Sequence, residues 1–193
     1  MKTNPPKKLK NIERRVREYL AYNEVEKLIV CARKISRNGY RNSTMILLAY
    51  RHALRVSELI NLKWDQIDLE EGKIHINRLK KGINSVHPLS GKEIRALKKI
   101  KKEYPSQSYI FISEQKAPLS DSAFRKIMMK TGKEAGFNFP LHPHMLRHST
   151  GFKLANDGQD TRSIQHYLGH KNIQHTVRYT ELASGRFNNF WGD

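Results

Sequence analysis

The chain has 193 residues, of which 38% are hydrophobic and 28% charged, a composition typical of a globular protein with room for one core. Its formal net charge of +18 attracts polyanions, so nucleic acid or an anionic membrane surface is the expected partner. Cys31 is the only cysteine, which excludes an internal disulfide and is typical of a reducing cytoplasm. We expect neither a membrane span nor a signal peptide, because no long apolar run occurs and the amino terminus is polar and basic.

The first 20 residues are predicted to form a basic arm. Pro5 and Pro6 disfavour an early helix, because proline lacks the amide hydrogen that a helix interior needs. The arm carries a series of cations: Lys2, Lys7, Lys8, Lys10, Arg14, Arg15 and Arg17. Such an arm either stays solvated or lies along the phosphates of a nucleic acid, and the sequence leaves both interpretations open.

Three helices are predicted to follow the arm. Asn23 with Glu26 is typical of a helix start, and Gly39 is typical of a helix end. A second helix is expected over residues 43–53. Ser57 is the expected cap of a short third helix, and Arg55 lies at the break before it. The arginine can face a ligand there, or it can simply bind carbonyl groups.

From Trp64 onward the pattern changes to strands. Residues 65–69, 73–79 and 85–89 read as strands, since polar and apolar side chains alternate most clearly in the second. Lys80, Lys81 and Gly82 form the expected tip of a basic hairpin. The segments predicted next are a basic helix over 90–104, an extended stretch over 109–112 and a helix over 119–135 that stops at Gly136.

The stretch from His142 to Thr180 carries the side chains with chemistry. Pro143 suits the first turn of a helix, and His144, Arg147 and His148 then lie one turn apart on one face. Asp160 is the expected cap of the next helix, and Gly169 its expected end. His170 follows on the turn, and Tyr179 lies on a last helix that Asn172 caps.

These residue types suit attack on a phosphodiester by a phenol. The phenol, with an ordinary pKa of about 10, must lose its proton, and nearby cations favour this. The five-coordinate phosphorus needs fixed positive charge, which Arg55, Arg147 and the histidines can supply. The leaving 5′ oxygen needs an acid, for which Lys80 is the candidate. No metal or other cofactor is expected, because no acidic cluster stands ready to hold a metal ion.

Two other interpretations stay open at this point. A zinc site is the rival, because His142, His144 and His148 form a histidine cluster, and His166 with His170 has helical ligand spacing. Against it, Arg147 lies among the histidines and no carboxylate supports the imidazoles. Alternatively, each histidine is an ordinary core or surface residue and Tyr179 is one of eight ordinary tyrosines.

The order of four motifs resembles the tyrosine recombinase (phage integrase) family. The motifs span residues 54–59, 144–148, 168–170 and 176–180, and the resemblance extends over about residues 40 to 182. The resemblance implies a role for each residue of the catalytic set: phosphate binding for Arg55 and Arg147, the two histidine positions for His144 and His170, the hairpin lysine for Lys80 and the nucleophile for Tyr179. It also implies that Glu58 supports the first arginine.

The resemblance is stronger still to the short recombinases that invert fimbrial promoter segments, through residues 78–82, 87–89, 142–148 and 160–162. Like these, the chain has only about forty residues before the region of resemblance, and we expect no separate clamping domain. Ala53 stands where many family members have glycine.

The family resemblance implies an α+β fold, mainly α-helical, with a small antiparallel sheet. Its expected divisions are a basic arm (1–20), a catalytic domain (21–185) and a carboxy-terminal tail (186–193). The implied function is site-specific recombination through a 3′-phosphotyrosine intermediate, with inversion or integration of a DNA segment. The implied partners are double-stranded DNA with specific sites, a tetramer of copies on paired sites and accessory DNA-bending proteins, in the cytoplasm at the nucleoid and not at a membrane. A non-catalytic DNA-binding regulator and a type IB topoisomerase-like relaxase are the alternatives.

Overall fold

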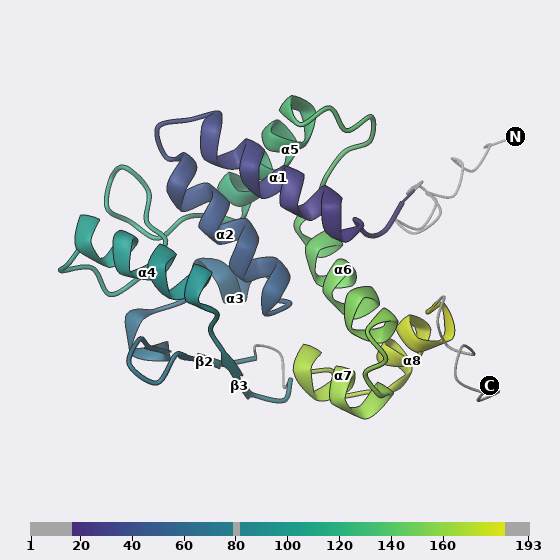
Figure 1. Ribbon diagram of the computed structural model, residues 1–193. Coiled ribbons are helices and arrows are strands. Elements are labelled where there is room, and N and C mark those ends of the chain that lie inside the picture. Colours follow the sequence, from purple (N-terminus) through teal and green to yellow (C-terminus); the bar gives the residue numbers. More distant parts are fainter. Residues whose placement is uncertain (1–16, 79–81, 184–193) are drawn as a thin grey trace, which may run out of the picture.

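The computed structural model describes residues 17–78 and 82–183, and within them the chain is mainly helical (Figure 1). The predicted basic arm and tail lie almost entirely outside these residues, as does Lys80 at the hairpin tip. The α-helices are α1 (Tyr22–Lys34), α2 (Gly39–Arg51), α3 (Val56–Ile60), α4 (Gly91–Glu103), α5 (Asp121–Glu134), α6 (Pro143–Asn156), α7 (Thr161–Leu168) and α8 (Gln174–Glu181). A single 3₁₀ turn, η1 (Trp64–Gln66), precedes the first strand.

Helices α1 and α2 form an antiparallel pair, and Gly39 begins α2 instead of ending α1. The prediction for Gly39 was therefore wrong, and its reason is a close approach of backbone. A Cβ atom at Gly39 would lie 2.2 Å from the carbonyl oxygen of Arg33, so only glycine lets the chain turn this tightly. Helix α2 consequently starts four residues before the predicted range, and ten of its residues are buried.

Two predicted helix caps were displaced by two residues. Helix α1 starts after Ala21, whose amide donates to Glu24 at 2.8 Å, so Glu24 fills the capping role expected of Glu26. Helix α3 starts after Arg55, not after Ser57, and the Arg55 amide donates to the Glu58 carboxylate at 2.9 Å. In both cases the acid three residues into the helix fixes the start, as in a capping box.

The sheet has three antiparallel strands in the order β1 (Ile67–Asp68), β2 (Lys73–Ile76) and β3 (Ser85–Pro88). Ile74 pairs with His87 and Ile76 with Ser85. The sheet confirms the predicted small antiparallel unit. The stretch 109–112 adds no strand to it and makes only isolated bridges, although Phe111 is fully buried.

Two apolar clusters hold the helices together. The larger one contains side chains of α1 to α5 and of the first turn of α6, including Leu28, Met45 and Met145. The smaller one lies where α6, α7 and α8 meet, at the opposite end of α6 (Figure 1), and includes Phe152 and Tyr179. No helix in the described part of the chain is both long and apolar enough to cross a membrane.

Candidate active site

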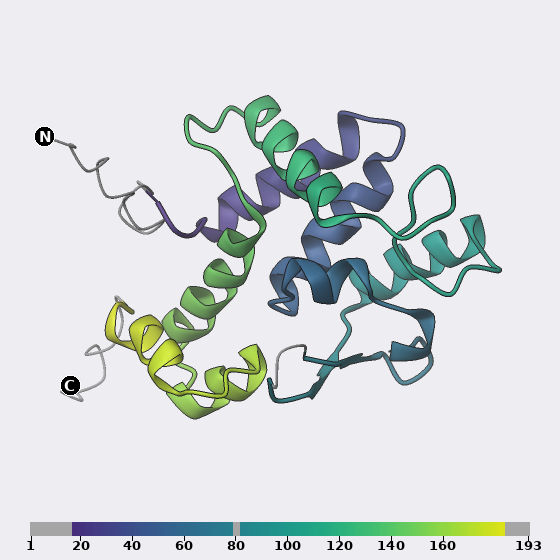
Figure 2. The ribbon, with the colours of Figure 1, turned by 180° about the vertical axis from the view of Figure 1, so that it is seen from behind.

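A cavity of about 620 Å³ lies between the start of α3 and the turn after α7. Figure 2 shows the ribbon of these segments from behind. Its lining includes Arg55, Gly82, Gly169 and His170. Local sequence rules position two of these groups. Arg55 is the residue before α3, and Gly169 ends α7 with a φ of 65°, a left-handed conformation that favours glycine. Arg55 and His170, both predicted site residues, therefore face one cavity.

Glu58 lies behind Arg55 and binds two arginines. One carboxylate oxygen accepts from Arg55 Nη1 at 2.7 Å and the other from Arg78 Nη1 at 2.8 Å. Burial alone would raise the pKa of Glu58, but Arg78 and Arg55 outweigh it and hold that pKa below its usual range. Glu58 is therefore ionised, and it orients Arg55 as the family resemblance implied.

Arg147 is buried beside this group, on the second turn of α6. Its Nη1 donates to the carbonyl oxygen of Ala53 at 2.6 Å, and its Nη2 donates to that of Leu168 at 2.6 Å. Burial, followed by the charges of Arg55 and Arg78, lowers the pKa of Arg147 to about 9, so the guanidinium is still charged at pH 7. The arginines crowd one another, and an added negative charge here would relieve that repulsion.

The carbonyl of Ala53 also accepts from Arg78 at 3.3 Å. Ala53 has a φ of 51°, which costs an L-residue other than glycine about 1–2 kcal/mol. The hydrogen bonds from two guanidinium groups compensate for that cost. The left-handed backbone also explains why glycine suits this position in the family that the sequence resembles.

His170 is buried, and its Nδ1 lies 2.8 Å from the hydroxyl of Thr176. Burial, followed by the charges of Arg147 and Arg55, lowers the pKa of His170 to about 3. The imidazole is therefore neutral at pH 7. Its ring is stacked at 15° to the ring of Tyr179, with centroids 6.4 Å apart.

Tyr179 is only 1% exposed and does not line the cavity. Its phenol oxygen lies 2.8 Å from Nδ1 of His148, and its ring packs edge-on against Phe152. A Cβ atom at Gly151 would lie 2.7 Å from the phenol ring, so glycine makes room for it on α6. The phenol is thus enclosed between α6 and α8, in a position from which it cannot reach a phosphodiester.

The environment of Tyr179 also differs from the expected one electrostatically. Burial raises the pKa of the phenol, and the neighbouring Arg147 and Arg178 only partly offset it. The neighbouring cations therefore do favour the phenolate, as predicted, but in this conformation burial outweighs them. Burial, followed by Arg178, lowers the pKa of His148 to about 4, so a neutral imidazole can accept the phenol hydrogen when its own proton is on Nε2.

His144 is exposed on the first turn of α6, close enough to His148 to contribute to the lowered pKa of that residue. The rival zinc interpretation finds no support: His148 binds Tyr179, and within residues 17–78 and 82–183 no three histidine, cysteine or acidic side chains are close enough to hold a metal ion. The pair His166 and His170 does not support a metal site either, because His166 is exposed and His170 is buried. Lys80, the candidate acid, lies outside the described residues.

Sequence reasoning missed two residues of this site, Arg78 and His148. Arg78 lies two residues beyond the end of β2 and continues the alternation of the buried Ile74 and Ile76, so the pattern itself put a cation on an apolar face. This alternation was the signal from which the sequence could have identified Arg78. His148 was expected on one helix face with His144 and Arg147, but no local pattern indicated that it meets a tyrosine 31 residues away.

Comparisons with known proteins agree with the motifs. The model described as "Phage integrase family" matches residues 18–186. The chain is 44% identical over 180 residues to the type 1 fimbriae regulatory protein FimB of Escherichia coli K12, which covers 91% of this chain and 90% of FimB. It is 30% identical over 182 residues to the tyrosine recombinase XerC of Bacillus pumilus, covering 89% of this chain and 59% of XerC.

Solved structures share the fold. The crystal structure of the XerH site-specific recombinase bound to its difH substrate, a pre-cleavage complex, superposes with a TM-score of 0.73 at 26% identity. The match covers 90% of this chain and 52% of the XerH chain. The chain thus spans about half the length of XerH and nearly the whole of FimB.

Proposed function

The chain belongs to the phage integrase family, and on that premise we propose that it is a site-specific DNA recombinase acting through a 3′-phosphotyrosine intermediate on Tyr179. One observation carries the proposal. Arg55, Arg78 and Arg147 gather beside one cavity, Glu58 pairs with the first two, and burial followed by the charges of those two arginines lowers the pKa of Arg147. A phosphodiester supplies the missing negative charge.

In the proposed cleavage step, Arg55 and Arg147 bind the non-bridging oxygens of the scissile phosphate. Arg147 uses only two of its five N–H groups on carbonyl oxygens, which leaves donors for phosphate. His144 and His170 add hydrogen bonds to the same oxygens. The Tyr179 oxygen gives its proton to the neutral imidazole of His148, its hydrogen-bond partner, and bonds to phosphorus. The bond from phosphorus to the 5′ oxygen breaks, and Lys80 protonates that oxygen.

The burial of Tyr179 means that the described conformation precedes this step. Helix α8 has to shift relative to α6 before the phenol reaches a phosphate in the cavity. DNA binding is the event that we propose for this shift, because it delivers the anion for which the arginines are arranged.

The proposed partners follow from the reaction. Recombination joins two DNA sites and exchanges both strands of each, so we propose a tetramer on paired sites, with accessory DNA-bending proteins. The basic arm and the charge of +18 would bind the flanking phosphates. The proposed place of action is the bacterial nucleoid in the cytoplasm.

The experiment is covalent capture. Nicked genomic fragments from the source organism are incubated with the protein, adducts that resist denaturant are isolated, and the attached DNA is sequenced. A nicked suicide substrate built from that sequence should then trap the wild-type protein, because the short 5′ strand diffuses away. The adduct should form in EDTA, since the cations of the protein itself stabilise the transition state.

Tyr179→Phe should bind the same DNA and form no adduct, and peptide mapping should place the nucleotide on Tyr179. Tyr167→Phe is the matched control, because that tyrosine also makes a hydrogen bond but lies on α7. An adduct with Tyr179→Phe would show that another residue is the nucleophile. Relaxation of supercoils by a monomer, without exchange of sites, would favour the topoisomerase alternative.

The enclosed phenol is the observation that favours a second candidate, a DNA-binding regulator without catalysis. Specific DNA binding by the wild-type protein without an adduct on any captured sequence, with or without a second site present, would decide for that candidate.

A further inference from the structure

Arg78 is a fully buried cation that the proposed reaction does not use. Its side chain has an exposure of 0%, and its guanidinium makes hydrogen bonds to two separate segments of the chain. Nη1 donates to Glu58 at 2.8 Å and to the carbonyl of Ala53 at 3.3 Å. Nη2 donates to the carbonyls of Tyr167 at 2.7 Å and His52 at 3.3 Å. A planar fork of donors is the group suited to such an arrangement.

These partners flank the candidate site residues. Residues 52–58 include Arg55, and the carbonyl of Tyr167 lies three residues before His170. The backbone amide of Arg78 also donates to Asn84 at 2.8 Å, on the returning side of the hairpin. The side chain of Arg78 therefore joins the start of α3 to the end of α7, and its backbone amide ties the same residue to the base of the β2–β3 hairpin.

Two glycines let Arg78 occupy this position. A Cβ atom at Gly82 would lie 2.7 Å from Cβ of Arg78, and one at Gly169 would lie 2.7 Å from its Cγ. Both glycines line the cavity together with Arg55 and His170. The aliphatic part of Arg78 thus fills the space behind the cavity.

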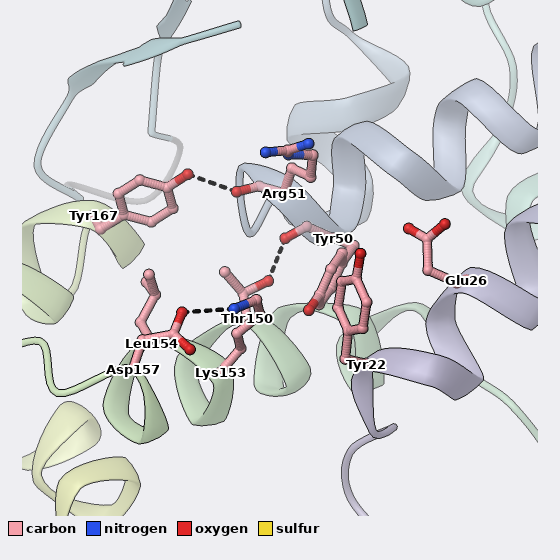
Figure 3. A pocket seen from close by; sticks show the side chains of 9 residues that line it. All are labelled: Tyr22, Glu26, Tyr50, Arg51, Thr150, Lys153, Leu154, Asp157 and Tyr167. Carbon is pink, nitrogen blue, oxygen red and sulfur yellow. Dashed lines mark hydrogen bonds and ion pairs between the residues drawn. The ribbon is translucent and has the colours of Figure 1, made fainter. Parts of the chain in front are cut away.

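The energetics of burial indicate that stabilising the fold is not the role of Arg78. Burying a guanidinium costs several kcal/mol of desolvation, and replacing buried ion pairs by apolar side chains is often neutral or stabilising. Moreover, a second contact already joins the same two segments, since the Tyr167 hydroxyl donates to the carbonyl of Arg51 at 2.6 Å (Figure 3). What the guanidinium adds is a fixed geometry among the segments.

We propose that Arg78 is a positioning residue that sets the distance and orientation of Arg55 relative to His170. The inference rests on the proposed function, because both residues are assigned there to the scissile phosphate. Arg78 does not touch the substrate itself: it acts through Glu58, which orients Arg55, and through the carbonyl of Tyr167, which fixes the turn before His170.

The test distinguishes an effect on the geometry of the site from the effects of a lost charge and of impaired folding. Arg78→Lys keeps the charge but cannot make the four hydrogen bonds, and Arg78→Met keeps much of the aliphatic volume without the charge. Both variants should slow adduct formation on the suicide substrate about a hundredfold, the usual effect of displacing a catalytic group by about 1 Å. Noncovalent affinity for the same DNA should change less than about threefold, as expected for a residue that positions without contacting DNA.

Arg41→Met is the matched control. Arg41 is also a partly buried arginine that donates to a carbonyl, that of Ile112 at 2.6 Å, but it lies on α2 away from the cavity. This control should keep the wild-type rate of adduct formation. Thermal unfolding of all the variants shows whether any loss reflects the folded population.

Each outcome of these measurements either supports the positioning role of Arg78 or overturns it. If Arg78→Lys forms the adduct at the wild-type rate, or if Arg41→Met loses as much activity as Arg78→Met, the positioning role is overturned while the proposed function stands. If Arg78→Met does not fold, Arg78→Lys alone carries the test. If the wild-type protein forms no adduct, the proposed function fails, and this inference fails with it.

Discussion

Tyr179 and the histidines around it show how burial sets the chemistry of single residues. Burial raises the pKa of the Tyr179 phenol, which shares a hydrogen bond with His148. The nucleophile assigned above is therefore protonated and enclosed before DNA arrives. His148 and His170 both have lowered pKa values, although positively charged histidines would suit a phosphate. The arginines are thus the charged groups of this site at pH 7.

Stability should fall as the pH is lowered from 7 to 5. Burial lowers the pKa of His87 and His170 to about 3 and of His148 to about 4, from an ordinary value of 6.5. In that window the unfolded chain takes up protons that the folded chain does not, so the free energy of unfolding decreases. Each histidine contributes up to about 1.4 kcal/mol per pH unit.

Denaturant unfolding at several pH values measures this slope. His148→Gln should flatten it, whereas His75→Gln should leave it unchanged, because His75 is exposed on β2. A free energy of unfolding that stays constant or rises toward pH 5 would contradict the prediction.

Lys80 can be tested as the acid although it lies outside the described residues. Lys80→Ala should slow cleavage of a normal strand far more than that of a strand with a 5′-bridging phosphorothiolate, since sulfur leaves without a proton. Loss of general acid catalysis typically costs about 10²–10⁴-fold. Equal losses on both substrates would remove Lys80 from this role, and Lys81 would be tested next.

At the scale of elements, the position of α8 depends on the segment before α1. Arg178, next to Tyr179, forms an ion pair with Glu18, and Tyr19 packs on Phe152 of α6 with ring centroids 4.1 Å apart. The amide of Leu20 donates to Ser149 at 2.8 Å. The last residues of the predicted basic arm thus contact both helices that enclose the phenol.

Glu18→Gln should therefore speed adduct formation. The ion pair is partly exposed, and such a pair is worth up to about 1 kcal/mol, so the gain should be at most about fivefold. Single-turnover adduct formation on the suicide substrate measures it. Glu26→Gln is the control, because it removes the same charge from α1, where Glu26 pairs with Lys92. Its rate of adduct formation should rise no more than the loss of one negative charge by itself explains. An equal gain in both variants would argue against control of α8 by Glu18.

At the scale of the whole molecule, net charge governs the encounter with DNA. The charge of +18 and the cation-rich first 20 residues predict binding that weakens steeply with salt. Each neutralised phosphate adds about 0.9 to the slope of log K against log salt. Fluorescence anisotropy with a labelled duplex at several salt concentrations measures the slope.

Removing lysine charges from the basic arm tests whether the arm contacts DNA phosphates. The double change Lys7→Gln with Lys8→Gln should reduce the slope by up to about 2, which corresponds to two phosphate contacts. Lys98→Gln with Lys102→Gln on α4 is the charge-matched comparison and should reduce it less. Equal reductions would mean that the arm has no special part in DNA binding, and a nearly flat plot for the wild type would contradict the polyanion interpretation.

The sequence by itself determined the family and the elements whose ends depend on local chemistry. Pro143 starts α6, Asp160 caps α7 through the amides of Arg162 and Ser163, and Gly169 ends it in a left-handed conformation, all as predicted. These features act within one turn of helix, so residue type and spacing suffice to read them. The order of motifs around them identified the family in the same way.

Only the tertiary structure decided which side chains meet. Tyr179 is joined to His148 across 31 residues, Arg78 to Tyr167 across 89, and Arg178 to Glu18 across 160. No periodicity encodes such contacts, because they follow from the packing of α6, α7 and α8 against the rest. For the same reason, the sequence placed a tyrosine suited to attack a phosphodiester, and only the packing of helices revealed that its phenol is enclosed.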